Sequence, residues 1–382
     1  MKHTVKIFLA VLVGTLVLGC NSMRPEERQA LLLKASYNGD LATVEKLLTD
    51  GVDVNARMGE EGYFALQAAA NNNQLAVVKK LLAAGADPHL LSYTLWSALG
   101  EACYEGHINI VYALVEHGVN IEQKITSNQA TVLSIAASRG HSDIVSYLLQ
   151  KKANTEARDS EGWTALFFAI RNNQKEIVQL LVENKANVNA TADDGYTPLM
   201  CAARWSDVET IQYLQSKNAQ VKAKDKDGWT ALFYAAMGGS LENVQYLVEQ
   251  GLNINDKESD LWTPLFLAAK HGHLSIVKYL VEKGAEVDPV NNKGWTPFFH
   301  ACREGHYEIA KYLLEKGASI NRRSKEQVTP LMLAAYGGNL QIVKLLVENG
   351  ANVHAKDEDG EEAIDWAREA KNTQIVNYLK QF

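Results

Sequence analysis

The sequence has few prolines, few cysteines and no excess of positive charge, and each shortage argues against a class of protein. Its 7 prolines are too few for a collagen-like rod, and its 4 cysteines are too few for a disulfide-rich miniprotein. A hydrophobic share of 47% in 382 residues excludes a disordered acidic tail. The formal net charge of −7 provides no basic face for wrapping nucleic acid, so no nucleic-acid partner is expected.

The apolar run near the N-terminus is too short for a comfortable transmembrane helix. Ile7–Leu18 follows the basic residues Lys2 and Lys6. About a dozen helical residues span about 18 Å, whereas a bilayer core is about 30 Å thick. This pattern is typical of an export signal. A signal cleaved elsewhere and a retained signal anchor are the two alternatives.

The end of this run, Val17-Leu18-Gly19-Cys20, resembles the lipobox of bacterial lipoproteins. The resemblance implies a signal peptide over residues 1–19, lipidation of Cys20 as the new N-terminus, and a short tether over residues 20–29. More than one acyl chain would anchor the protein stably in a membrane. Asn21 in place of Asp favours the outer membrane, where there is one. We therefore expect the bacterial cell envelope, on its periplasmic or surface side.

The rest of the chain repeats with a period of about 33 residues. A threonine marks this register at Thr131, Thr164, Thr197, Thr230, Thr263, Thr296 and Thr329. Ser97 and Phe64 extend the register toward the N-terminus, and Glu362 extends it toward the C-terminus. About eleven units fit, including an atypical cap at each end.

Each unit reads as two helices followed by a polar loop. The threonine is the predicted N-cap of the first helix, with its hydroxyl accepting from an early backbone N–H. An alanine pair follows, and Gly-His ends the helix, as in Gly272-His273. The second helix carries apolar pairs at helical spacing and ends at Gly-Ala, as in Gly284-Ala285. The pattern predicts an all-α solenoid stabilised by stacking.

This pattern resembles the ankyrin repeat over residues 30–382. The resemblance implies helix-turn-helix units with hairpin-like loop fingers, and we expect a monomer. The family's histidine after Thr-Pro-Leu is absent throughout. Phenylalanine holds that place in four units and methionine in two: Phe167, Phe233, Phe266, Phe299, Met200 and Met332. We therefore expect apolar contacts to replace the hydrogen bonds of the histidine.

No residue pattern indicates catalysis or a cofactor. Phosphate-binding loops, Gly-x-Ser-x-Gly and zinc-protease motifs are absent, so we expect neither an enzyme nor a bound metal. The pair His271 and His273 lacks further ligands. Three cysteines within first helices are expected to be buried free thiols: Cys103, Cys201 and Cys302.

The candidate binding site is the position just before each threonine. Aromatic residues hold it in five successive units: Trp163, Tyr196, Trp229, Trp262 and Trp295. The ends of the first helices add basic and aromatic residues: Arg171, Arg204, Trp205, Lys270, Arg303 and Tyr336. In the ankyrin family these positions line a concave groove, and Trp, Tyr and Arg are enriched in binding hot spots.

The sequence therefore predicts a lipid-anchored, non-catalytic protein that binds a protein or peptide in an aromatic and basic groove. The alternative is a structural spacer or assembly scaffold without a defined ligand. In that alternative, the tryptophans would serve only the packing of repeats.

Overall fold

The computed structural model describes residues 23–382 and divides into two compact units, unit 1 (Met1–Asn187) and unit 2 (Val188–Phe382). The predicted signal peptide, residues 1–19, and Cys20 lie outside the described residues. In the described part, the first helix begins at Pro25, within the segment assigned above to the tether.

Ten helices form unit 1, and twelve form unit 2, within residues 23–382. Those of unit 1 are α1 (Pro25–Asn38), α2 (Leu41–Thr49), α3 (Ala65–Asn71), α4 (Leu75–Ala83), α5 (Ala98–Glu105), α6 (Ile108–Glu116), α7 (Val132–Arg139), α8 (Ser142–Gln150), α9 (Ala165–Arg171) and α10 (Lys175–Glu183). Those of unit 2 are α11 (Pro198–Trp205), α12 (Val208–Ser216), α13 (Ala231–Gly238), α14 (Leu241–Glu249), α15 (Pro264–Lys270), α16 (Leu274–Glu282), α17 (Pro297–Glu304), α18 (Tyr307–Glu315), α19 (Pro330–Tyr336), α20 (Leu340–Glu348), α21 (Ala363–Glu369) and α22 (Thr373–Leu379).

The predicted all-α solenoid of about eleven helix pairs is confirmed. Within each unit, every odd-numbered helix packs on the next odd-numbered helix and on its own even-numbered partner. No helix among residues 23–382 is long and apolar enough to span a bilayer.

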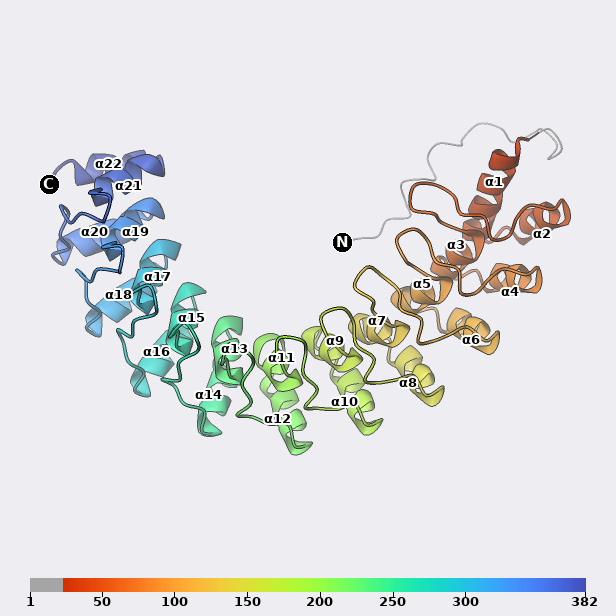
Figure 1. Ribbon diagram of the computed structural model, residues 1–382, viewed down its shortest axis with the longest axis horizontal. Coiled ribbons are helices and arrows are strands. Elements are labelled where there is room, and N and C mark those ends of the chain that lie inside the picture. Colours follow the sequence, from red (N-terminus) through yellow and green to blue (C-terminus); the bar gives the residue numbers. More distant parts are fainter. Residues whose placement is uncertain (1–22) are drawn as a thin grey trace. The chain divides into compact units, whose positions relative to one another are not determined.

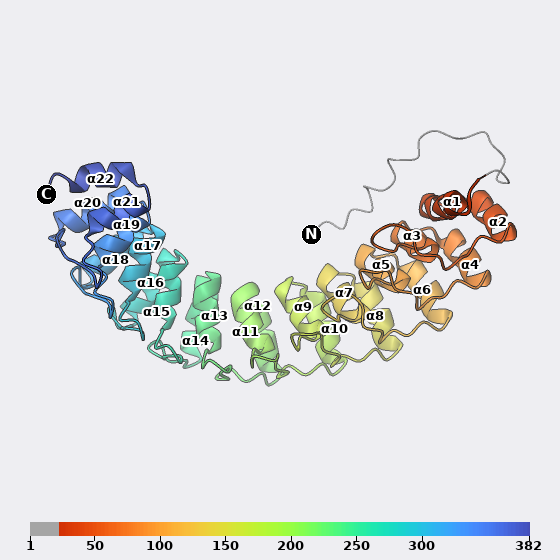
Figure 2. The same cartoon turned by 45° about the horizontal axis from the view of Figure 1, so that its top comes forward.

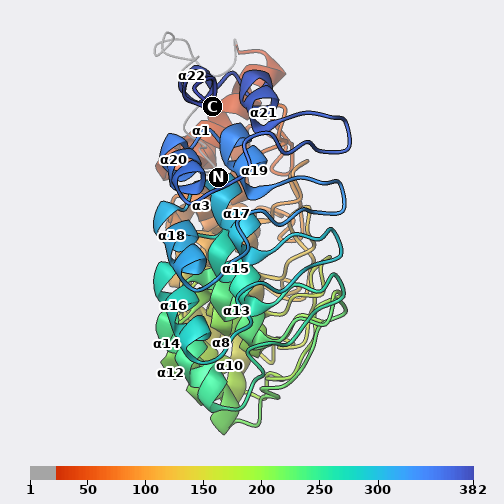
Figure 3. The same cartoon turned by 90° about the vertical axis from the view of Figure 1, so that its left-hand side faces the viewer.

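Within each unit the helices form two layers, with the connecting loops on one side (Figures 1 and 2). Figure 3 shows this for unit 2 as three columns: the even-numbered helices, then the odd-numbered helices, then the loops. We call the odd-numbered helices loop-side helices and the even-numbered ones back helices. The ends of the loop-side helices and the bases of the loops therefore share one face of each unit.

Residues of the threonine register start the loop-side helices from α3 to α21, but not always through the predicted side-chain cap. The hydroxyls of Ser97, Thr131, Thr197 and Thr329 accept from the backbone N–H three residues on. The prediction is wrong for four threonines, whose hydroxyls make no such bond: Thr164, Thr230, Thr263 and Thr296. In these four helix pairs the residue three places after the threonine is phenylalanine. In three of them the phenylalanine N–H donates to the threonine carbonyl instead.

The Gly-His sequences tie four helix pairs to the helix pair that precedes each of them. The glycine ends the helix in a left-handed conformation, as at Gly305 with φ of 82°. The following histidine places Nε2 about 3 Å from a main-chain oxygen of the preceding pair, as in His306 to Lys270 (3.0 Å) and His273 to Met237 (3.1 Å). Asn243 serves the same purpose, because its buried amide donates to the carbonyl of Ala203 at 3.1 Å.

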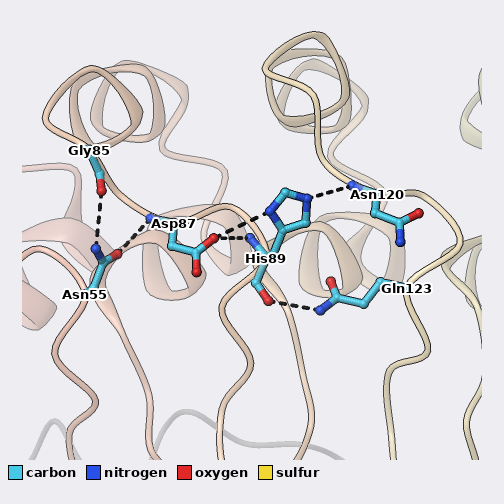
Figure 4. Close-up of polar contacts among 6 residues, drawn as sticks. All are labelled: Asn55, Gly85, Asp87, His89, Asn120 and Gln123. Atoms are coloured by element: carbon cyan, nitrogen blue, oxygen red, sulfur yellow. Dashed lines mark hydrogen bonds and ion pairs between the residues drawn. The ribbon is translucent and has the colours of Figure 1, made fainter.

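A second set of bonds joins successive loops through side chains that follow the back helices. The Asn55 amide donates to the Gly85 carbonyl (3.2 Å) and accepts from the Asp87 N–H (2.7 Å), as Figure 4 shows. After the next back helix, His89 Nε2 accepts from the Asn120 N–H at 3.1 Å. We call this series the loop spine. In unit 2 its asparagines are Asn189, Asn255 and Asn321.

Candidate protein-binding face

In unit 2 each tryptophan of the register is fixed at the base of a loop by its main chain. The Trp262 N–H donates to Glu258 Oε1 at 2.8 Å, and its carbonyl accepts from the Glu258 N–H at 3.2 Å. Trp295 is held in the same way by Asn291. The indole ring is thereby directed at the start of the following helix.

Each indole packs on the phenylalanine that replaces the family's histidine. The ring centroids lie 5.6 Å apart for Trp229–Phe233, 5.3 Å for Trp262–Phe266 and 6.0 Å for Trp295–Phe299. All three phenylalanines are fully buried, whereas the tryptophans are half-buried. The expectation that apolar contact replaces the histidine's hydrogen bonds is confirmed for these three phenylalanines, whereas Met332 Sδ accepts from the Thr329 N–H at 3.3 Å. The indoles are therefore partly structural and partly accessible.

Unit 1 repeats this arrangement at Trp163. Its ring centroid lies 5.4 Å from that of Phe167, and the Arg171 guanidinium lies 5.5 Å from the indole centroid. Trp163 is half-buried and Arg171 is exposed. The predicted pairing of an aromatic loop base with a basic helix end thus occurs within unit 1.

In unit 2 five side chains form a continuous series across α15 and α17. Lys270 Nζ lies 5.1 Å from the Trp262 ring centroid, and the Arg303 guanidinium lies 5.6 Å from that of Trp295. His300 lies between the two indoles, with centroid distances of 4.8 Å to Trp262 and 5.2 Å to Trp295. We call Lys270, Trp262, His300, Trp295 and Arg303 the cation–indole series.

His300 is the member of this series that sequence reasoning missed. It is 5% exposed, and neither ring nitrogen has a hydrogen-bond partner among residues 23–382. Burial, followed by the charges of Lys270 and Arg303, lowers its pKa to about 3. A neutral, buried imidazole therefore separates the two cations. Its sequence signal was weak, because neighbouring units hold Leu267 and Leu333 at this position.

Tyr196, the tyrosine of the register, holds the same place at the base of its loop but is more buried than the tryptophans. It is 5% exposed, so its ring supports the half-buried Tyr234 at a centroid distance of 4.7 Å rather than facing solvent. The Tyr234 hydroxyl donates to Asp225 Oδ2 at 2.6 Å. Burial, together with this carboxylate, raises the pKa of Tyr234. Tyr196 therefore contributes to this face only by supporting the ring of Tyr234.

The remaining predicted residues lie at the ends of loop-side helices. Trp205 and Tyr336 are each 44% exposed, and the Arg204 guanidinium lies 4.5 Å from the Trp205 ring centroid. The Tyr336 ring contacts the Trp366 ring edge-on at 5.9 Å. These two rings provide the most accessible aromatic surface among the predicted site residues.

Two helix-end cations of unit 2 differ in their pairing from two cations of its loops. Lys224 and Arg322, in loops, lie 2.8 and 3.0 Å from carboxylates. Within residues 23–382, no carboxylate lies within 4.0 Å of Lys270 or Arg204, and Arg303 reaches only Glu304, at 4.0 Å. Lys270 and Arg204 thus carry positive charge that no carboxylate of residues 23–382 neutralises at contact distance.

The cysteines and His273, also singled out in the sequence, have structural roles. Cys103, Cys201 and Cys302 are buried and form no disulfide within residues 23–382, as predicted, and burial raises the pKa of Cys103 and Cys302. His273 is occupied by the main-chain contact to the preceding pair. Residues 23–382 contain no group of three side chains that could hold a metal ion.

Comparison with known protein families covers almost all of the repeats. A model described as ankyrin repeats (3 copies) matches residues 31–125, 99–192, 184–258 and 252–324, and one described as ankyrin repeats (many copies) matches residues 313–367. The chain belongs to the ankyrin-repeat family. Ankyrin repeats typically mediate protein–protein binding.

Two curated relatives share short stretches with this ankyrin-repeat chain. The ankyrin repeat and KH domain-containing protein mask of Drosophila melanogaster is 40% identical over 70 residues, 18% of this chain. The phosphocholine transferase AnkX of Legionella pneumophila is 34% identical over 65 residues, 17% of this chain. The matches span 2% and 7% of those two proteins, and the match to AnkX covers only the repeat region.

Proposed function

We propose that this ankyrin-repeat protein is a lipid-anchored, non-catalytic binding protein of the bacterial envelope. It holds a protein or peptide partner against the loop-side helix ends and loop bases. The observation that carries the proposal is the combination of half-buried indoles with two basic side chains, Lys270 and Arg204, that have no carboxylate of the described residues within 4.0 Å. Aromatic and basic residues of this kind dominate the energetics of protein interfaces.

The test must separate binding from folding. Each register tryptophan packs on a buried phenylalanine, so its replacement by alanine would lower stability as well as binding. Trp205→Ser with Tyr336→Ser removes accessible rings instead. Tyr112→Ser is the matched control, because Tyr112 is 39% exposed on the back helix α6.

In-cell crosslinking with mass spectrometry compares these variants with the wild type. We expect the Trp205→Ser, Tyr336→Ser chain to lose the wild-type partner, and the Tyr112→Ser chain to keep it. Equal crosslinks in all three chains would remove the loop side from the proposal.

The lipid anchor rests on the lipobox-like sequence alone and has its own test. Metabolic labelling with a fatty acid should mark the wild type and leave Cys20→Ala unlabelled. Fractionation of the two chains should then place only the wild type with membranes. Equal labelling would remove both the anchor and the envelope location that we propose.

A structural spacer is the second candidate, and the packing of each indole on a phenylalanine favours it. In that case Trp262→Phe would lower the urea midpoint without changing any crosslinked partner. Acrylamide should also quench the tryptophan fluorescence weakly. Strong quenching together with a lost partner would favour binding.

A further inference from the structure

The cation–indole series includes two basic helix ends in a chain of negative net charge, although carboxylates of the loop bases, such as Glu258 and Asp225, share the same face. The loop-side helices α11, α13, α15, α17 and α19 contain three cations, Arg204, Lys270 and Arg303, and one acidic residue, Glu304. The chain as a whole has a net charge of −7. A locally positive strip in an acidic protein selects a compact anionic ligand over a large polyanion, because long-range repulsion acts on the latter.

The cations of this strip follow the repeat register. Lys270 and Arg303 hold the same place in consecutive helix pairs, and Arg204 holds it two pairs before Lys270. Neighbouring helices pack about 10 Å apart, so these intervals correspond to about 10 and 20 Å. A ligand that uses all three cations must carry negative groups at matching intervals.

A polyproline II segment has this geometry. It advances about 3.1 Å per residue with three residues per turn, so every third side chain lies on one face about 9.3 Å from the last. Indole rings beside each cation provide the aromatic surface on which such segments dock. A β-strand fits less well, since residues three apart lie on opposite faces.

We propose that unit 2 binds an acidic, proline-rich segment of a partner protein in the polyproline II conformation, with carboxylates three residues apart that pair with Lys270 and Arg303. A third carboxylate six residues from the Lys270 partner pairs with Arg204. This inference rests on the proposed function and names the chemistry of its partner. The prolines between the carboxylates lie on Trp262 and Trp295.

His300 reports on the occupancy of this site. Lys270, Arg303 and His271 are the cationic or titratable groups whose charges hold its pKa low, in addition to burial. Carboxylates bound at Lys270 and Arg303 offset those charges, so the pKa of His300 must rise on binding. An occupant elsewhere on unit 2 would leave it unchanged.

The test uses synthetic peptides of one composition and two registers. The fluorescein-labelled probe (Glu-Pro-Pro)5 places a carboxylate on every third residue, and the control has five contiguous glutamates followed by ten prolines. Binding to the full chain is measured by fluorescence anisotropy at 50 and 300 mM salt. Vesicles of anionic lipid and inorganic phosphate serve as competitors that test the two other sources of anionic groups.

A matched pair of charge variants locates the site. Lys270→Glu with Arg303→Glu reverses the two cations of the series. Lys278→Glu with Lys311→Glu makes the same charge change on the back helices α16 and α18, at exposed residues that also hold equivalent places in consecutive pairs. Circular dichroism melts confirm that both variants fold.

We expect the register-matched probe to bind at least tenfold more tightly than the contiguous one, with weaker binding at high salt. Lys270→Glu with Arg303→Glu should weaken the matched probe at least a hundredfold, about tenfold for each ion pair removed. The back-helix control should change it less than threefold. The pKa of His300, followed by NMR of histidine-labelled protein, should rise in the complex.

Equal affinity for the two registers, or equal effects of the two charge variants, would overturn the inference. So would competition by vesicles or phosphate at concentrations that match the probe. If the probe fails while crosslinking still depends on Trp205 and Tyr336, the proposed function stands and its acidic partner does not. If both fail, the loop-side face is not a binding site.

Discussion

His300 makes the stability of unit 2 depend on pH, and one substitution isolates the effect. Its folded pKa of about 3 lies below its ordinary value of 6.5, so between these values the unfolded chain binds the proton more tightly. The contribution of neutral His300 to the free energy of unfolding is therefore fully present above pH 6.5. It is lost as the pH falls from 6.5 toward 3. The difference predicts a loss of about 2 kcal/mol between pH 7.5 and pH 5.0.

His300→Leu removes this dependence with little disturbance, because leucine already holds the position in the adjacent units at Leu267 and Leu333. At pH 7.5 the variant should be at least as stable as the wild type, since it removes two buried nitrogens that lack partners. At pH 5.0 it should exceed the wild type by about 2 kcal/mol.

Urea unfolding at the two pH values, followed by tryptophan fluorescence, measures the difference. Subtracting the variant from the wild type cancels the other histidines, which both chains share. The sequence pI is about 5.9, so dilute protein is needed to avoid association near that pH. An unchanged pH dependence in His300→Leu would refute the reasoning, because it would mean that His300 is hydrated or paired.

Three further predictions concern the fold. Gly272→Ala should cost more than Gly284→Ala in urea unfolding, by about 1 kcal/mol or more, since both have positive φ but only the Cβ at 272 would meet a side chain, His306 at 2.7 Å; equal costs would contradict this. Asn243→Ala should lower stability by about 2–3 kcal/mol, because two main-chain oxygens of the preceding pair lose their donor; a urea midpoint unchanged from wild type would show those oxygens to be hydrated. In a Cys20→Ala chain the remaining cysteines are Cys103, Cys201 and Cys302, and burial protects all three. A thiol reagent should therefore react only after urea is added. Prompt reaction without urea would show local opening.

The sequence was sufficient for the fold because each unit carries the same local signals. Thr263-Pro264 begins a helix and Gly272 follows its last turn regardless of the rest of the chain, so the regular recurrence of these signals specified the pairs. The caps of the four Phe-containing units could not be foreseen in the same way. There the backbone of residues such as Phe266 bonds to the threonine carbonyl instead of its hydroxyl.

Only part of the candidate site could be predicted from the sequence. The register located Trp262 and Trp295, and helix ends located Lys270 and Arg303. His300 joins them through the stacking of two consecutive pairs, which no single unit contains. The loop spine was missed for a similar reason, because its asparagines recur only in every second helix pair of unit 2 while other polar residues hold the places between.

The loop spine has a direction that makes the two ends of a unit unequal. Each asparagine reaches only toward its C-terminal neighbour, as Asn255 does toward Gly284 and Asn321 toward Gly350. Among the asparagine bonds of the loop spine in unit 2, removal of helix pairs from the C-terminal end therefore leaves a side-chain amide without its partner at every second cut. Removal from the N-terminal end leaves only main-chain carbonyl and N–H groups of these bonds without theirs. Serial deletions from the two ends should consequently lose stability at different rates, and identical rates would show that water replaces these bonds at no cost.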